Sequence, residues 1–262
     1  MSFKIKKFQF ICLFILLSCQ NQEAGKNRKM SRQESINPID GSNIEGHYQA
    51  KFTTLNSHIN GTIPGSANLY RIKDRLFAYV RLFGGGINAW HMQNIYIGTK
   101  CPTLLDDLNQ DGFIDIDEAE KVLGKIIIPL DNNIKTQKAG EKRYPYADLS
   151  GNYAYERVTS FSDFLKDLNR EDENLLDNVI KISKQSGFDF KNLTVLIQGV
   201  EEGKDLPDTV TTKAPHESYQ TIPITCGTFE KILKAPGEVY DENEIPGPIE
   251  DSEDESEGTN TN

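Results

Sequence analysis

The feature that most constrains this chain is a succession of short apolar segments, each about as long as one β-strand. In RLFAYVRLF, every second residue is apolar, as expected for a strand with one face in a core: Leu76, Ala78, Val80 and Leu82. HYQAKFTTL, NIYIG, KIIIPL, NYAYERV, LTVLIQGV and QTIPITCGTFEKIL are similarly rich in β-branched and aromatic residues. Turn signals such as NGTIPG, KD and GGG separate several of these segments. We predict a mainly β, antiparallel, Greek-key-like sandwich.

One helical excursion, over residues 160–186, interrupts the strands. Ser160 is a candidate N-cap for FSDFLKDLNRE, and Asp172 is one for ENLLDNVIKISKQSG. Apolar residues of the second segment recur at helical spacing: Leu175, Val179 and Ile182. We therefore expect one β domain over residues 44–235 that contains a short helical insert.

DLNQDGFIDIDE, residues 107–118, has the pattern of a calcium-binding loop. A twelve-residue loop supplies oxygen ligands at positions 1, 3, 5, 7, 9 and 12. Those positions hold Asp107, Asn109, Asp111, the backbone carbonyl of Phe113, Asp115 and Glu118. Gly112 stands at position 6, where the backbone turns sharply, and the apolar Ile114 at position 8 can attach the loop to a core. The segment resembles the EF-hand family over these twelve residues, and the resemblance implies bound calcium.

The flanks of the loop differ from the family pattern, which has a helix of several turns on each side. CPTLLD before the loop has room for about one turn, and EAEKVLG after it for about two turns before Gly124. KIIIPL then indicates a strand. Without a second loop or a pair of long helices, calcium sensing by helix opening is not expected. We expect the ion to hold one segment of the sandwich in shape.

The N-terminus, MSFKIKKFQFICLFILLSCQ, places lysines before an apolar run that is too short to span a membrane, which is typical of a secretory signal. The sequence LLSC ending at Cys19 resembles the bacterial lipoprotein signal motif. The resemblance implies removal of residues 1–18 and attachment of lipid to Cys19, and Gln20 implies sorting to the outer membrane. We predict a cell-envelope protein that contacts the membrane through this lipid, with residues 19–43 as a polar tether.

Two cysteines remain for the folded domain, because Cys12 leaves with the signal and Cys19 takes the lipid. Cys101 and Cys226 form an even pair in an exported, oxidising setting. We predict a disulfide between them.

The C-terminal segment, residues 236–262, contains ten acidic residues and no Lys or Arg, which accounts for the whole formal net charge of −10. A segment of this composition has too little apolar surface to form a core, so we predict a disordered, solvating acidic tail. The negative net charge argues against nucleic-acid binding.

A second resemblance rests on NAWHMQNIYIG, with GTIPGSANL and RLFAYVRLF upstream. Residues 46–98 resemble the CHRD domain and the Cu/Zn superoxide dismutase sandwich, which implies an antiparallel Greek-key fold. The dismutase redox site is not implied, because His91 is followed by Asn94 and Tyr96 and no His-x-His occurs. We interpret His91 as a partly buried, hydrogen-bonded strand residue. Convergence of His47, His91 and His216 in space is an alternative that the sequence leaves open.

Motifs for catalysis are absent from the sequence. GGG lacks a following Gly-Lys-Ser/Thr, no Gly-x-Ser-x-Gly occurs, and no free cysteine remains to act as a nucleophile. We predict a non-enzymatic envelope protein with structural calcium, which binds an envelope protein or a glycan. The alternatives are a dismutase-like or carbohydrate-acting envelope enzyme and a calcium-tuned adhesion module.

Overall fold

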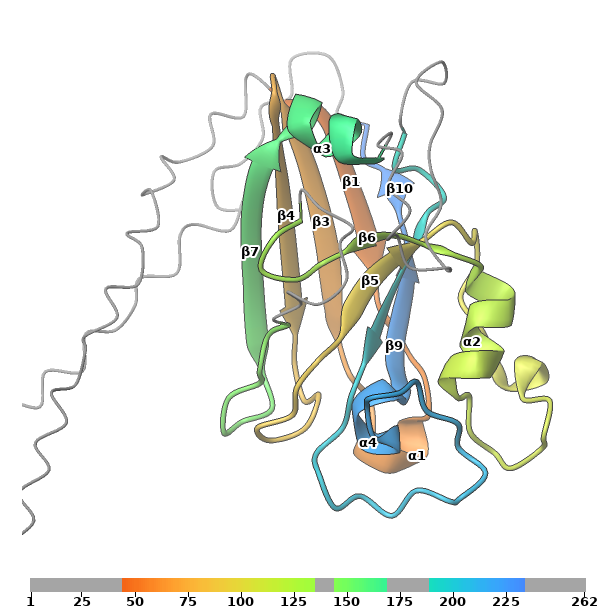
Figure 1. The fold of residues 1–262 in the computed structure, drawn as a ribbon. Helices are drawn as coiled ribbons and strands as arrows, with labels where there is room; N and C mark the ends of the chain where they lie inside the picture. Colours follow the sequence, from red (N-terminus) through yellow and green to blue (C-terminus); the bar gives the residue numbers. More distant parts are fainter. Residues whose placement is uncertain (1–43, 135–143, 169–188, 234–262) are drawn as a thin grey trace, which may run out of the picture. The chain divides into compact units, whose positions relative to one another are not determined.

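The computed structural model describes residues 44–134, 144–168 and 189–233 (Figure 1). The predicted signal peptide, the tether with Cys19, the acidic tail and the second part of the helical insert lie outside these residues.

Within the described residues, ten strands form two antiparallel sheets of five strands each. The first sheet has the order β10-β1-β3-β4-β7 and comprises β1 (Ile44–Lys51), β3 (Gly65–Ile72), β4 (Arg75–Leu82), β7 (Tyr153–Ser160) and β10 (Glu230–Lys231). The second has the order β2-β9-β8-β5-β6 and comprises β2 (Thr53–Thr54), β5 (Gln93–Tyr96), β6 (Ile126–Pro129), β8 (Thr194–Gln198) and β9 (Pro223–Thr228). The predicted antiparallel β-sandwich is confirmed.

Five short helical elements connect the strands of the described part: α1 (Ser57–Asn60), η2 (Leu104–Asp106), α2 (Ile116–Leu123), α3 (Phe161–Leu168) and α4 (Ser218–Thr221). Ser160 caps α3 as predicted, because its hydroxyl accepts a hydrogen bond from the Asp163 N–H at 3.2 Å. Asp74, in the β3–β4 turn, also accepts one from the Ser162 N–H at 2.8 Å. Within the described residues, every helix is too short or too polar to cross a bilayer.

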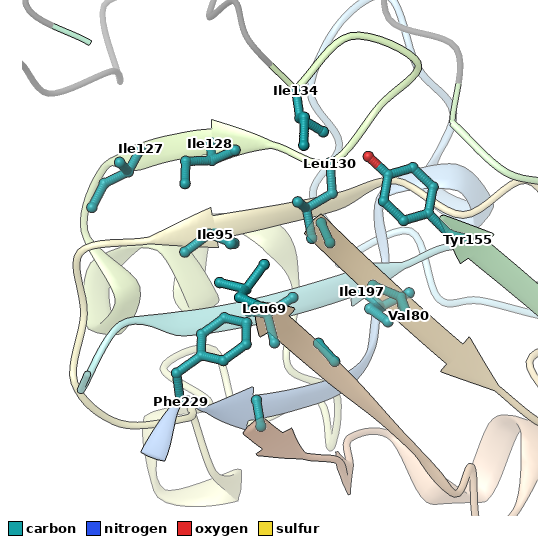
Figure 2. Packing of buried hydrophobic residues seen from close by; sticks show 14 of the residues in the cluster. Leu69, Val80, Ile95, Ile127, Ile128, Leu130, Ile134, Tyr155, Ile197 and Phe229 are labelled. Carbon is teal, nitrogen blue, oxygen red and sulfur yellow. The ribbon is translucent and has the colours of Figure 1, made fainter. Parts of the chain in front are cut away.

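The main core lies between the two sheets. Apolar side chains from both inner faces pack there, as Figure 2 shows for Leu69, Val80, Ile95 and Ile197. The predicted inward face of β4 is confirmed, since Leu76, Ala78, Val80 and Leu82 are all at most 2 % exposed and belong to this core.

A second, smaller core lies on the opposite face of the second sheet. In β8, Val195 and Ile197 join the main core, whereas Leu196 between them points to this smaller cluster, as strand alternation requires. Three residues of α2 pack there: Ile116, Ala119 and Leu123. They pack together with Ile114, Cys226 and side chains from β5 and β6. The second core therefore attaches α2 and the end of the predicted calcium loop to the sandwich.

Candidate metal centre

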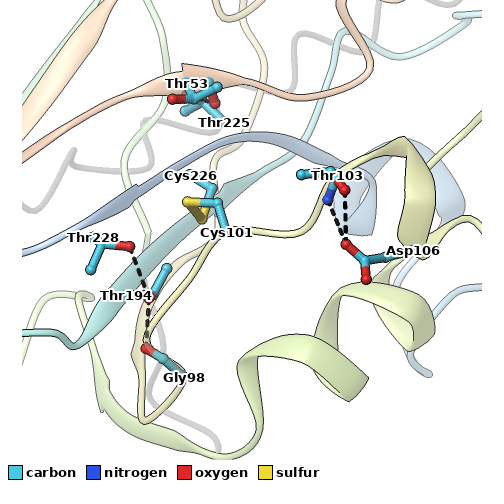
Figure 3. Close-up of a disulfide and its surroundings, with 9 residues drawn as sticks. All are labelled: Thr53, Gly98, Cys101, Thr103, Asp106, Thr194, Thr225, Cys226 and Thr228. Carbon is cyan, nitrogen blue, oxygen red and sulfur yellow. Dashed lines mark hydrogen bonds between the residues drawn. A yellow bond between two sulfur atoms is a disulfide. The ribbon is translucent and has the colours of Figure 1, made fainter.

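Two short helical elements bracket the predicted calcium loop. The 3₁₀ turn η2 begins after Thr103, whose hydroxyl and N–H both lie within hydrogen-bonding distance of the Asp106 carboxylate (Figure 3). The helix α2 begins within the last residues of the loop and ends at Leu123, followed by the C-cap Gly124, whose φ of 70° suits glycine. The lengths of η2 and α2 agree with the prediction of about one helical turn before the loop and about two after it.

The first half of the loop is held by backbone N–H groups that donate to its own polar side chains. The Asp107 carboxylate accepts from the N–H groups of Gln110 and Gly112, at 2.7 and 2.8 Å. Asp111 accepts from the Phe113 N–H at 2.8 Å. Gln110 and Gly112 have φ angles of 61° and 88°, so the sharp turn expected at Gly112 is present.

Two carboxylates in the second half of the loop are buried. Asp115 is 2 % exposed and Glu118 is 4 % exposed. They form the capping box of α2, because each carboxylate accepts the backbone N–H of the other residue, at 2.9 and 3.1 Å. Glu118 also reaches back across the loop and accepts from the Leu108 and Asn109 N–H groups, at 2.7 and 3.3 Å.

No basic side chain of the described part forms an ion pair with Asp115 or Glu118. Their partners are all backbone N–H groups, including that of Thr211, which lies 3.1 Å from an Asp115 oxygen. Buried charges in proteins are normally paired or bound to a metal ion, and neither of these two carboxylates has a cationic partner among the described side chains.

The carboxylates of the loop do not converge on one point in this conformation. Across the described ranges, no group of three or more His, Cys, Asp or Glu side chains is arranged to hold a metal ion. The donor set is nevertheless composed entirely of oxygen, which is the chemistry that calcium requires. The backbone turns suit a calcium loop, whereas the carboxylates would have to come closer together to act as ligands of one ion.

Ile114, at position 8 of the loop, is fixed to the sandwich as predicted. Its side chain is 1 % exposed in the second core. The side-chain amide of Asn56 also bonds to both backbone groups of Ile114: the Ile114 N–H donates to Oδ1 at 2.8 Å, and Nδ2 donates to the Ile114 carbonyl at 2.9 Å. Sequence reasoning did not find Asn56, because no spacing rule links residues 58 positions apart.

Another contact that the sequence did not indicate comes from residues 209–213. The Thr209 carbonyl lies 3.4 Å from Asn109 Nδ2, and Lys213 pairs with both Asp117 and Glu120 on α2. The hydrogen bond from Lys213 lowers the pKa of Asp117. Burial acts to raise the pKa of Asp111, but hydrogen bonds, the strongest from Thr209, outweigh it and lower that pKa.

The predicted disulfide between Cys101 and Cys226 is present, with the two Cα atoms 5.7 Å apart (Figure 3). It joins the segment that enters the calcium loop to β9, where Cys226 is fully buried. Next to it, the Thr194 hydroxyl donates to the Gly98 carbonyl at 2.6 Å, which attaches the same segment to β8. The entrance of the loop is therefore fastened to the second sheet at two points.

The histidines do not form a second metal site within the described residues. The prediction of a partly buried strand residue is wrong for His91: it is fully buried, stacks on Tyr153 and lies before the start of β5. Its Nδ1 lies 3.1 Å from the Gln198 carbonyl and must carry the proton, since a carbonyl only accepts. Burial lowers the pKa of His91 to about 4. His47 stacks on Tyr70, and His216 packs against Trp90.

Comparisons with known proteins give only distant likenesses, all of them to solved structures. No protein-family model matches the sequence, and no curated protein matches it. Among solved structures, the chain is similar to the Cu/Zn superoxide dismutase from Brucella abortus, with a TM-score of 0.32 and 13 % identity, over 70 % of this chain and 99 % of that chain. This likeness is too distant to transfer any site residue.

Proposed function

We propose that this protein is a lipid-anchored envelope protein in which one calcium ion, bound by residues 107–118, stabilises a β-sandwich used for interaction. The observation that carries the proposal is the burial of Asp115 and Glu118 without a cationic partner. A calcium ion would compensate their charge and that of two further carboxylates, Asp107 and Asp111. Asn109 and the Phe113 carbonyl would complete the oxygen set.

A bracing role fits the attachments of the loop better than a switching role. The disulfide, the second core and the Asn56 amide all tie the loop to the second sheet. The flanking elements, η2 and α2, have only three and eight residues, so no pair of long helices is available to open. The ion would therefore raise stability and rigidity and would leave the fold unchanged.

The test is thermal unfolding with calcium and with a chelator. For a Kd on the order of 10⁻⁴ M, as in weak extracellular sites, calcium at roughly 100 times the Kd adds about 2.7 kcal/mol to the free energy of unfolding. For a domain of this size, that corresponds to an increase in Tm of about 5–10 °C. Equal melting temperatures in calcium and in chelator would overturn the proposal.

The variant Asp111→Ala tests whether the calcium-dependent increase in Tm comes from this loop. It should lose the calcium-dependent increase in Tm, while the Tm in chelator falls only slightly. The matched control is Asp148→Ala: Asp148 also accepts nearby backbone N–H groups, from Ser150 and Asn152, but in another loop. Asp148→Ala should retain the calcium response, and its loss there would argue against a site at residues 107–118.

Metal analysis of the purified protein separates this proposal from the enzyme alternative. Calcium as the bound metal supports the bracing role, whereas stoichiometric copper or zinc would favour a dismutase-like activity instead. A glycan or an envelope protein remains the proposed ligand of the sandwich.

The anchor is supported by the sequence motif at Cys19 and is tested independently of calcium. In a bacterial host, the mature protein should begin at Cys19, carry the mass of several acyl chains and fractionate with membranes. Cys19→Ser should release it to the soluble fraction. An unmodified Cys19 in the membrane-extracted protein would refute the lipoprotein assignment.

A further inference from the structure

Asn56 stands out because its backbone and side chain serve two different purposes. It lies between β2 and α1, is 6 % exposed, and has the left-handed backbone angles φ 49° and ψ 43°. Asparagine tolerates this conformation better than most residues, which explains part of its presence. It precedes α1, yet its side chain makes no capping hydrogen bond to that helix. The amide is directed elsewhere.

The amide makes three hydrogen bonds, and two of them go to the middle of the calcium loop. Oδ1 accepts from the Ile114 N–H at 2.8 Å, while Nδ2 donates to the Ile114 carbonyl at 2.9 Å and to the Pro223 carbonyl at 2.9 Å. Exchange of one N–H and one carbonyl bond is what a neighbouring antiparallel strand provides to a residue. Asn56 thus gives the loop the two backbone hydrogen bonds that it would otherwise receive from a neighbouring strand.

This support acts at the point where two predicted ligands meet. Ile114 lies between Phe113, whose carbonyl is the predicted backbone ligand, and Asp115, which is buried. Two hydrogen bonds to Ile114 restrict rotation of the peptide groups on both of its sides. The third bond, to Pro223, fastens the same amide to the start of β9, the strand that also carries Cys226.

We propose that Asn56 is a positioning residue for calcium: it holds the Phe113 carbonyl and Asp115 in place and couples the loop to β9. This inference rests on the proposed calcium function. Partners outside the ligand shell that orient metal ligands typically contribute about 10–100-fold to affinity. The same contribution is expected here.

The main variant is Asn56→Gly. Glycine accepts the left-handed backbone without strain and removes only the amide, so the variant should fold. Calcium titrated calorimetrically into this protein should bind with a Kd raised by about 10–100-fold relative to the wild type. The Ile114 N–H should also exchange faster with solvent in chelator, since it loses its acceptor.

A matched control separates positioning from general destabilisation. Gln198 is also a buried amide, 2 % exposed, and its Nε2 donates to the Thr221 carbonyl at 2.8 Å, but it does not contact the loop. Gln198→Ala should lower the Tm while its Kd for calcium stays within about threefold of the wild type, which is below the effect expected for an orienting partner.

Asn56→Asp provides a second variant of almost equal size. It keeps an acceptor for the Ile114 N–H and loses both donor bonds, while its added negative charge alone would strengthen calcium binding. A raised Kd in this variant therefore reports the lost hydrogen bonds. If the wild type binds calcium and Asn56→Gly binds it equally well, the inference is wrong and the proposed function stands. If the wild type does not bind calcium, both fail.

Discussion

Reduction of the disulfide should destabilise the sandwich and weaken calcium binding together. The bond joins cysteines 125 positions apart, so the chain-entropy relation gives about 5 kcal/mol of stabilisation. Native-state relaxation commonly reduces such values, and we expect a measured loss of about 3–5 kcal/mol. The affinity for calcium should also fall, because Cys101 is six residues before Asp107 and its disulfide to β9 fixes the entrance of the loop.

Urea unfolding under four conditions measures both effects: oxidised or reduced protein, each with calcium or with chelator. The double Cys101→Ala, Cys226→Ala variant replaces reduction where the buried bond resists the reductant. The two losses should be non-additive by at least about 0.5 kcal/mol, as for elements in direct contact. Strict additivity would refute the coupling of disulfide and loop. An unchanged urea midpoint after reduction would refute the stabilising role of the disulfide.

Two further experiments test the core and the loop backbone. The free energy of unfolding should fall by about 3 kcal/mol as the pH decreases from 6.5 to about 4, because unfolded His91 binds a proton that the buried ring with its pKa of about 4 does not. His91→Gln should remove this part of the pH dependence in urea titrations, and an identical profile for both proteins would contradict the assignment. Gly112→Ala and Gly203→Ala should each cost about 1 kcal/mol in chelator, because both glycines have positive φ angles, 88° and 87°, and open space where a Cβ would lie. Only Gly112→Ala should weaken calcium binding in calorimetry, and equal effects of both variants would argue against a site at this loop.

Local patterns predicted most of the secondary structure. The alternation in β4, the turn at Lys73 and Asp74 and the cap at Ser160 depend on residues close in sequence, and the structure has all three. The disulfide was also predictable, although it is not local, because the predicted signal cleavage and lipidation would leave only two cysteines to pair. In the loop, the sharp turn at Gly112 follows from spacing alone.

Contacts between distant segments were not predictable. Full burial of His91, which precedes β5, depends on its stacking on Tyr153 of β7, 62 positions away in the sequence. The position of Lys213 beside α2 depends on the path of the chain between β8 and β9. Asn56 shows the same limit, since its amide bonds to residues 58 and 167 positions away.

The sequence by itself determined the strand segments, the oxygen-rich loop and the pairing of the cysteines, because hydrophobic alternation, turn chemistry and ligand spacing act over a few residues. Tertiary structure alone decided which carboxylates lose contact with water and which amide supports the loop. Burial and long-range hydrogen bonds depend on how the two sheets and α2 pack together, and no local pattern specifies that packing.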